Sequence, residues 1–310
     1  MAATPPELTG GAAPARTGRD PARAVWIASG ACWILATGLV LAGGVWSCSG
    51  GVTRATWPWP AQLATAFAAW LVMIGAMMLP TIVPLVRLFV PVTSGVPNAV
   101  AVRLALLTGY LAVWSAFAVA ATLGHRGMDA LLDDHVRPAG LVLGVTLVVA
   151  GLFQLSPWKH ACLRACRSPW GFLWRYYGRG VRGGWTLGVR HGMFCLGCCW
   201  ALMLVMLGTG AGSLLWMLAL TAVMVVEKTT PGGASLAAPL GGALILAGVA
   251  VSVPAVWAAP ADLPANTSRA TGDGLGGEVA LVVTAIGLAV LWPVRAVARR
   301  RRRPRPIREI

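Results

Sequence analysis

Residues 61–86 read AQLATAFAAWLVMIGAMMLPTIVPLV, an apolar run with no charged side chain. A bilayer core of about 30 Å is crossed by roughly 20 helical residues, so this run is long enough to span a membrane. Similar runs recur along the chain, and the predicted spans are residues 24–46, 61–86, 103–124, 138–158, 187–208, 212–229, 236–258 and 277–296. The sequence therefore predicts an all-α, polytopic transmembrane helix bundle with about eight spanning helices.

The composition also favours a membrane protein over a soluble one. Of the 310 residues, 57% are hydrophobic and 11% are charged, whereas soluble domains carry about 25% charged residues. The net charge of +15 lies almost wholly between and beyond the apolar runs. The arginines of residues 299–303 follow the last predicted span, which is typical of an anchor facing anionic lipid rather than of a nucleic-acid surface. We therefore expect the lipid bilayer, and no nucleic acid, as a partner.

The distribution of basic residues predicts the orientation of the chain. Lysine and arginine concentrate on the cytoplasmic side of membrane spans. An inside N-terminus places these basic clusters on the cytoplasmic side: residues 16–23, 87–103, 159–190, 228 and 295–308. Both termini are thus predicted to be cytoplasmic. The expected parts of the chain are a disordered tail over 1–22, one transmembrane domain over 23–298 and a basic tail over 299–310.

The cysteines give the clearest chemical signal. Five of the seven lie in two short stretches, with Cys162 and Cys166 in the first, and Cys195, Cys198 and Cys199 in the second. His191, Cys195 and Cys198 follow the spacing i, i+4, i+7, so they share one face of a helix, with Cys199 at its edge. Thiols on the cytoplasmic side stay reduced, so we expect no disulfide framework. Thiolates suit Cu(I) or zinc, but the same spacing also fits a thiol redox pair.

Other residues with suitable chemistry lie near these stretches. Met73, Met77 and Met78 offer soft thioethers on one predicted span, followed by two prolines. Glu227 and Lys228 are adjacent and are interpreted as an ionic pair at the inner edge of the membrane. One helix face closes a tetrahedral metal shell poorly, so we expect the two cysteine stretches to approach each other.

Several motifs occur together in a characteristic order. They are Met73-Ile74-Gly75-Ala76-Met77-Met78-Leu79-Pro80, Lys159 with Cys162 and Cys166, His191-Gly192, Cys195-Leu196-Gly197-Cys198-Cys199-Trp200, and Glu227-Lys228. This series resembles the bacterial family described as predicted metal-binding integral membrane proteins, some of whose members are labelled copper chaperones. The resemblance covers about residues 60–230. It implies the inner membrane of a bacterium as the location and copper as the metal.

The leading hypothesis is a non-enzymatic membrane protein that holds or passes a soft transition metal near the inner face. Copper is the expected metal, with zinc or no metal as alternatives, and a metal-donor or metal-acceptor protein is the expected partner. The candidate site comprises primary ligands His191, Cys195, Cys198 and Cys199, a handover pair Cys162 and Cys166, a relay of Met73, Met77 and Met78, and supporting residues Lys159, Glu227 and Lys228.

Two other functions fit the same residues. One is a membrane thiol oxidoreductase that uses neighbouring cysteines, and the other is a structural or assembly subunit whose cysteines pack. The predicted spans contain no Ser/His/Asp arrangement, carboxylate pair or zinc-hydrolase motif, so hydrolytic catalysis is not expected. The sequence carries no signal for an oligomeric state.

Overall fold

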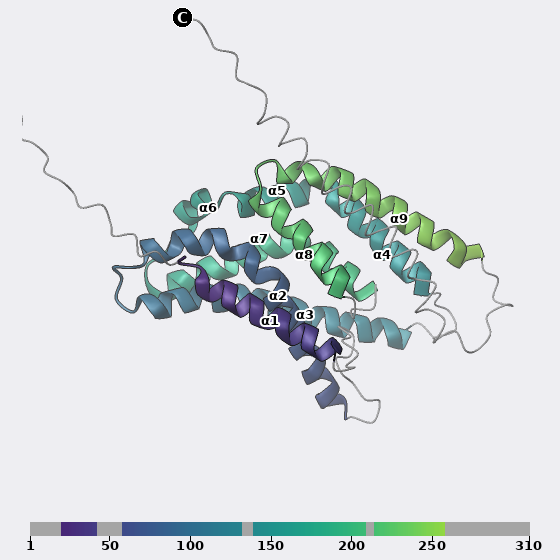
Figure 1. The fold of residues 1–310 in the computed structure, drawn as a ribbon, viewed down its shortest axis with the longest axis horizontal. Helices are drawn as coiled ribbons and strands as arrows, with labels where there is room; N and C mark the ends of the chain where they lie inside the picture. Colours follow the sequence, from purple (N-terminus) through teal and green to yellow (C-terminus); the bar gives the residue numbers. More distant parts are fainter. Residues whose placement is uncertain (1–19, 42–57, 132–138, 209–213, 258–310) are drawn as a thin grey trace, which may run out of the picture.

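The computed structural model describes residues 20–41, 58–131, 139–208 and 214–257, and all regular elements within these ranges are helical (Figure 1). They are α1 (Arg23–Leu41), α2 (Trp59–Val92), α3 (Ala99–Leu131), α4 (Ala139–Gln154), α5 (Pro157–Arg167), α6 (Pro169–Tyr176), α7 (Gly180–Gly208), α8 (Leu214–Thr229), the short 3-10 helix η2 (Gly233–Leu236) and α9 (Ala237–Trp257). The prediction of an all-α fold is confirmed for this part of the chain.

Several of these helices are suited to a membrane by length and composition. In the described ranges five helices pass that test, namely α1, α2, α3, α7 and α9, the last counted together with η2. Helices α4 and α5 form a sixth candidate only if they are taken as one bent span. The predicted run at 212–229 forms α8, which has only 16 residues. The predicted run at 277–296 lies outside the described residues.

The predicted span over residues 138–158 ends early because the chain turns at Ser156 and Pro157. Proline disfavours the helical conformation in the residue before it, and Ser156 is extended, with φ −72° and ψ 145°. Ser156 then caps α5 by accepting a hydrogen bond from the Lys159 main-chain N–H. As a result α4 and α5 meet at 65°. The connection over residues 159–190, one of the basic stretches expected on the cytoplasmic side, is largely helical in α5, α6 and the start of α7.

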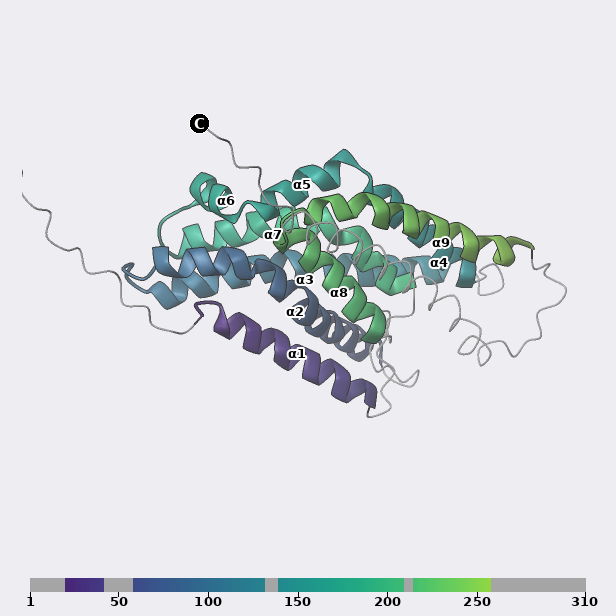
Figure 2. The ribbon, with the colours of Figure 1, turned by 45° about the horizontal axis from the view of Figure 1, so that its top comes forward.

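Glycines bring two pairs of helices into direct backbone contact. Gly184 and Gly188 of α7 face α3, where a Cβ atom on Gly188 would lie less than 3.0 Å from the Leu106 carbonyl oxygen. Helices α4 and α9, side by side in Figures 1 and 2, meet in the same way: a Cβ on Gly151 would lie 2.6 Å from the Gly241 carbonyl oxygen. Small residues permit this close packing of membrane helices.

Helix α1 lies at the edge of the bundle and packs on α2 (Figure 2). Pro80 has no N–H, so it cannot donate to the Ala76 carbonyl, its usual partner in an α-helix. Ser29 and Trp33 of α1 donate to that carbonyl instead, at 3.0 and 3.1 Å. The carbonyl that Pro80 leaves free is therefore satisfied by a neighbouring helix, which is one way that membrane helices tolerate proline.

Candidate functional site

Three thiols of α7 form the centre of the candidate site. Cys195, Cys198 and Cys199 are each only 1% exposed. The Cys198 and Cys199 thiols donate to the Cys195 carbonyl at 3.1 and 2.8 Å. The helix face that carries His191, Cys195 and Cys198 thus points into the bundle interior. Cys199, expected at the edge of this face, is covered as well, by a side chain from α8.

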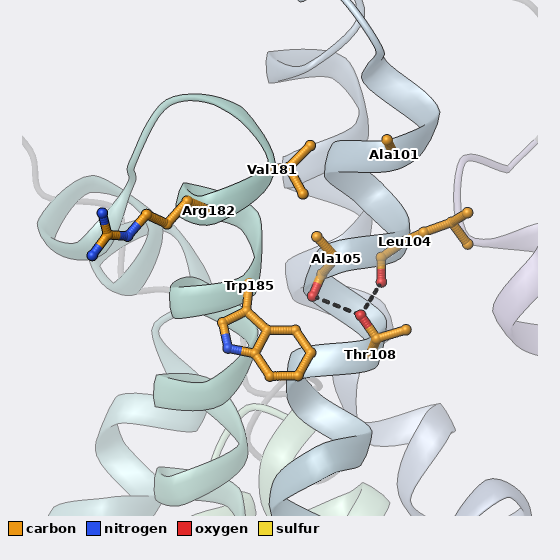
Figure 3. Close-up of a pocket in the computed structure, with 7 residues that line it drawn as sticks. All are labelled: Ala101, Leu104, Ala105, Thr108, Val181, Arg182 and Trp185. Carbon is orange, nitrogen blue, oxygen red and sulfur yellow. Dashed lines mark hydrogen bonds between the residues drawn. The ribbon is translucent and has the colours of Figure 1, made fainter.

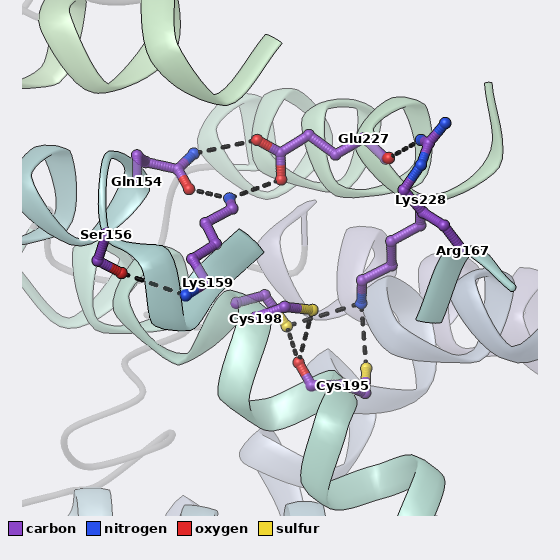
Figure 4. Close-up of polar contacts among 9 residues, drawn as sticks. Gln154, Ser156, Lys159, Arg167, Cys195, Cys198, Glu227 and Lys228 are labelled. Atoms are coloured by element: carbon purple, nitrogen blue, oxygen red, sulfur yellow. Dashed lines mark hydrogen bonds and ion pairs between the residues drawn. The ribbon is translucent and has the colours of Figure 1, made fainter. Parts of the chain in front are cut away.

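That side chain is Lys228, whose ammonium group points into the thiols (Figure 4). Its Nζ lies 3.0 Å from Cys195 Sγ, 3.7 Å from Cys199 Sγ and 3.4 Å from Thr81 Oγ1. Lys228 is itself only 6% exposed. A buried cation is therefore in direct contact with two of the proposed ligands.

Tyr110 and Thr81 complete the polar shell around Cys195. The Tyr110 hydroxyl lies 3.1 Å from Cys195 Sγ, and the Thr81 hydroxyl lies 3.7 Å from it. Both hydroxyls also donate to the Met78 carbonyl, at 3.1 and 2.8 Å. Met73, Met77 and Met78 are fully buried in α2, and the contact that joins this stretch to the thiols uses the Met78 main chain.

His191 lies one turn before Cys195 in an aromatic environment. Its ring centroid lies 5.2 Å from that of Phe172 and 5.9 Å from that of Tyr110. The side chain is 2% exposed, and Nδ1 has no hydrogen-bond partner among the described residues. An unsatisfied buried nitrogen is rare in folded proteins and needs an explanation; a metal ligand is one.

The first cysteine stretch lies on α5, directly against α7. Cys162 Sγ packs on Gly197, where a Cβ atom would lie 2.8 Å from the sulfur. Cys166 is buried, and its thiol neighbours that of Cys198. The expectation that the two stretches approach each other is therefore confirmed.

A second polar network lies beside the thiols and corrects one interpretation. Glu227 pairs with Lys159 of α5, with 2.7 Å between Oε2 and Nζ, and not with its neighbour Lys228 (Figure 4). Gln154 contacts both Lys159 and Glu227. Successive helical side chains point about 100° apart, so adjacent residues reach different partners. Arg167 adds hydrogen bonds to the carbonyls of Glu227 and Thr230.

The described side chains do not form a closed metal shell. Among them, no three His, Cys, Asp or Glu groups are arranged to hold a metal ion. A metal bound at the thiols would therefore use two of them, or some side chains would have to turn.

Among the residues of these networks that the sequence reasoning missed are Thr81, Tyr110 and Gln154. Each is a polar side chain within an apolar run, and polar groups in that setting are a general sign of function. Cys195, however, is 85 positions from Tyr110 and 114 from Thr81, so their pairing could not be predicted from local spacing.

A separate groove lies between α3 and α7 (Figure 3). Its lining residues are Ala101, Leu104, Ala105, Thr108, Val181, Arg182 and Trp185. The Thr108 hydroxyl is bonded to the Leu104 carbonyl at 2.9 Å. The groove is mainly apolar and shares no residue with the thiol cluster.

Comparison with known proteins gives a family for this chain. No curated protein and no solved structure matches it. A family model named PpoB2 and described as copper chaperone matches residues 67–251, which is more than half of the 310 residues. The matched region contains both cysteine stretches, His191 and Lys228, and it agrees with the family resemblance of the motifs. The chain belongs to the PpoB2 family of copper chaperones.

Proposed function

We propose that this protein is a multi-pass membrane protein that holds Cu(I) on the buried thiols of α7 and passes it to an acceptor protein. The observation that carries the proposal is the grouping of three buried thiols with an imidazole whose Nδ1 is unpaired among the described residues. This grouping lies in a chain of a family described as copper chaperone. Copper is then the cargo, and no enzymatic step is needed.

The donor chemistry fits a soft monovalent ion. Thiolate and thioether ligands favour Cu(I), which accepts as few as two donors. In our proposal the ligands come from Cys195, Cys198, Cys199 and His191, and two of these thiolates hold the ion at a time. Cys162 and Cys166 on α5 form the handover pair, since they lie directly beside the α7 thiols. The buried thioethers of Met73, Met77 and Met78 serve as a relay within α2.

The proposal also includes a membrane arrangement. About eight spans with both termini cytoplasmic would place the thiols near the inner face of a bacterial cytoplasmic membrane. The transmembrane domain would cover residues 23–298, between the two tails. The five or six span-length helices of the described ranges support this arrangement. The basic stretches between the apolar runs support the orientation.

Metal analysis of purified protein tests the function. The full chain is purified in mild detergent under reducing conditions, and its copper and zinc are measured beside a variant in which Cys195, Cys198 and Cys199 are all serine. Wild type should retain copper, and the triple variant should lose it. His191→Ala should weaken retention, because imidazole is a less soft donor than thiolate.

Cys32→Ser provides the matched control. Cys32 lies on α1, at the edge of the bundle, and packs against Gly75 of α2, and it is not one of the proposed ligands, so this variant should bind copper like wild type. Absence of copper and zinc from wild type, or full occupancy in Cys195→Ser and Cys198→Ser, would contradict the proposal. A crosslink between Cys195 and Cys198 that forms with oxidant, in a protein free of metal, would favour a thiol oxidoreductase instead.

A further inference from the structure

We propose that Lys228 determines the charge of the cargo, so that the site selects a soft monovalent cation on two thiolates over a soft divalent one. This inference rests on the proposed function and adds a specificity-determining residue to it. It is carried by the position of Lys228, its burial and the charges around it.

Lys228 is a buried cation whose contacts are with the thiol site. Its three polar contacts are Cys195, Cys199 and Thr81. The nearby carboxylate of Glu227 is already bound to Lys159 and Gln154. A lysine that merely anchors a helix end extends its ammonium group to the membrane surface, whereas Lys228 is 6% exposed and points at sulfur. Its positive charge is therefore a fixed part of the thiol site.

A buried site favours occupants that bring its total charge to zero, because an uncompensated charge is strongly unfavourable away from water. A monovalent ion on two thiolates carries a charge of −1, which the Lys228 ammonium neutralises. A divalent ion on the same two thiolates is neutral by itself, so the ammonium would remain uncompensated. The charge balance thus favours the monovalent ion.

The arrangement of the donors also bears on whether a divalent ion can reach a neutral site. A divalent ion would reach neutrality with a third thiolate. The Cys199 thiol lies next to those of Cys195 and Cys198, but no three His, Cys, Asp or Glu groups of the described residues are arranged to hold one metal ion. The Cys198 thiol is instead directed at the Cys195 carbonyl and neighbours Cys166. On binding a monovalent ion, two metal–sulfur bonds form, any protons on those two thiols leave, and no electron is transferred.

Ag(I) and Cd(II) separate the effect of charge from the effect of softness, because both ions are soft and they differ in charge. Their affinities for the full chain in detergent are measured by competition with a chromophoric chelator. The same two affinities for dithiothreitol, a dithiol without a neighbouring cation, serve as the reference. Wild type should prefer Ag(I) over Cd(II) by about tenfold or more beyond that reference, given the unfavourable charge left with Cd(II).

Two variants then test the residue itself. In Lys228→Gln the preference for Ag(I) should fall to that of dithiothreitol, with weaker Ag(I) binding and stronger Cd(II) binding. In Lys228→Arg, which keeps the charge, the preference should remain. Methionine is avoided at this position because its thioether is itself a soft donor. Size-exclusion profiles show which variants fold. The comparison of wild type with dithiothreitol does not depend on the variants.

The outcomes distinguish this inference from the proposed function. If wild type binds Ag(I) and Cu(I) but shows only the preference of dithiothreitol, the role of Lys228 is overturned and copper binding stands. The same holds if Lys228→Gln keeps the wild-type preference. If wild type binds none of these ions under reducing conditions, both proposals are overturned.

Discussion

Lys159 and Glu227 carry opposite charges where neither side chain reaches water, at 0% and 2% exposure. Removing one partner of a buried pair leaves an uncompensated charge and costs about 3–5 kcal/mol, whereas replacing both with apolar residues is often neutral. We expect Lys159→Met and Glu227→Leu each to lower the thermal stability strongly in detergent. The double variant should recover most of the loss, and additive losses would contradict this interpretation.

The exposed pair of Asp20 and Arg87 provides a contrast. Its ion pair of 2.6 Å joins the start of α1 to α2. The hydrogen bond from Arg87, together with that from the Ala22 N–H, lowers the pKa of Asp20 from 3.8 to about 2. A lowered carboxyl pKa stabilises the fold above pH 3.8, and this contribution is lost as the pH falls toward about 2.

We therefore expect Asp20→Asn to reduce the thermal stability slightly at pH 7, by less near pH 2 and not at all well below the folded-state pKa of about 2. Unfolding curves of both proteins over this range check the prediction. A difference that grew as the pH fell would contradict it, because it would have the sign of a raised pKa.

The sequence predicted the residues of the thiol cluster but not their neighbours. Helical spacing places His191, Cys195 and Cys198 on one face, since that relation is local to one helix. The contact of Lys228 with Cys195 joins two helices across 33 positions, and it depends on how α8 packs against α7. A pattern of adjacent charges suggested a Glu227–Lys228 pair, and tertiary packing gave each residue a different partner.

At the scale of helices, the α3–α7 contact leaves no room for a methyl group. A Cβ on Gly188 would lie less than 3.0 Å from the Leu106 carbonyl oxygen, and a backbone atom cannot turn away as a side chain can. We expect Gly188→Ala to destabilise the protein by about 1–3 kcal/mol, the usual range for overpacking. Thermal unfolding in detergent measures the effect.

Gly38→Ala on α1 is the matched control. A Cβ at Gly38 would meet nothing within 4 Å, and alanine has the higher helix propensity. This variant should be as stable as wild type or slightly more so. Equal losses from Gly188→Ala and Gly38→Ala would show that the close approach of the two backbones is not what stabilises the pair.

The apolar runs predicted most helices but not their ends. Hydropathy placed helices at α1, α2, α3 and α9 because spanning length and apolar composition are properties of the sequence itself. The span predicted over 138–158 continued through Ser156 and Pro157, where capping and the proline ring begin α5. The run at 212–229 was treated as an ordinary span, although α8 has only 16 residues and is shorter than the roughly 20 that cross a bilayer.

At the scale of the whole molecule, the orientation can be tested directly. The basic residues of 295–308 follow the last predicted span, and such clusters stay on the cytoplasmic side. A reporter that is active only in the cytoplasm should therefore work when fused at residue 310. A reporter that is active only outside should fail there and work when inserted between residues 258 and 276. Activity in the opposite pattern would reverse the orientation.

The glycine contact between α3 and α7 also restricts how the thiols can be reached. The two helices are in backbone contact there, without an intervening layer of side chains, so no side chain can rotate to open a path between them. On its other sides α7 meets α4, α5 and α8. Cys166 of α5 and Lys228 of α8 contact it through side chains, and lysine has many rotamers. If the thiols hold an ion as proposed, we expect it to enter and leave on the sides of α7 that face away from α3.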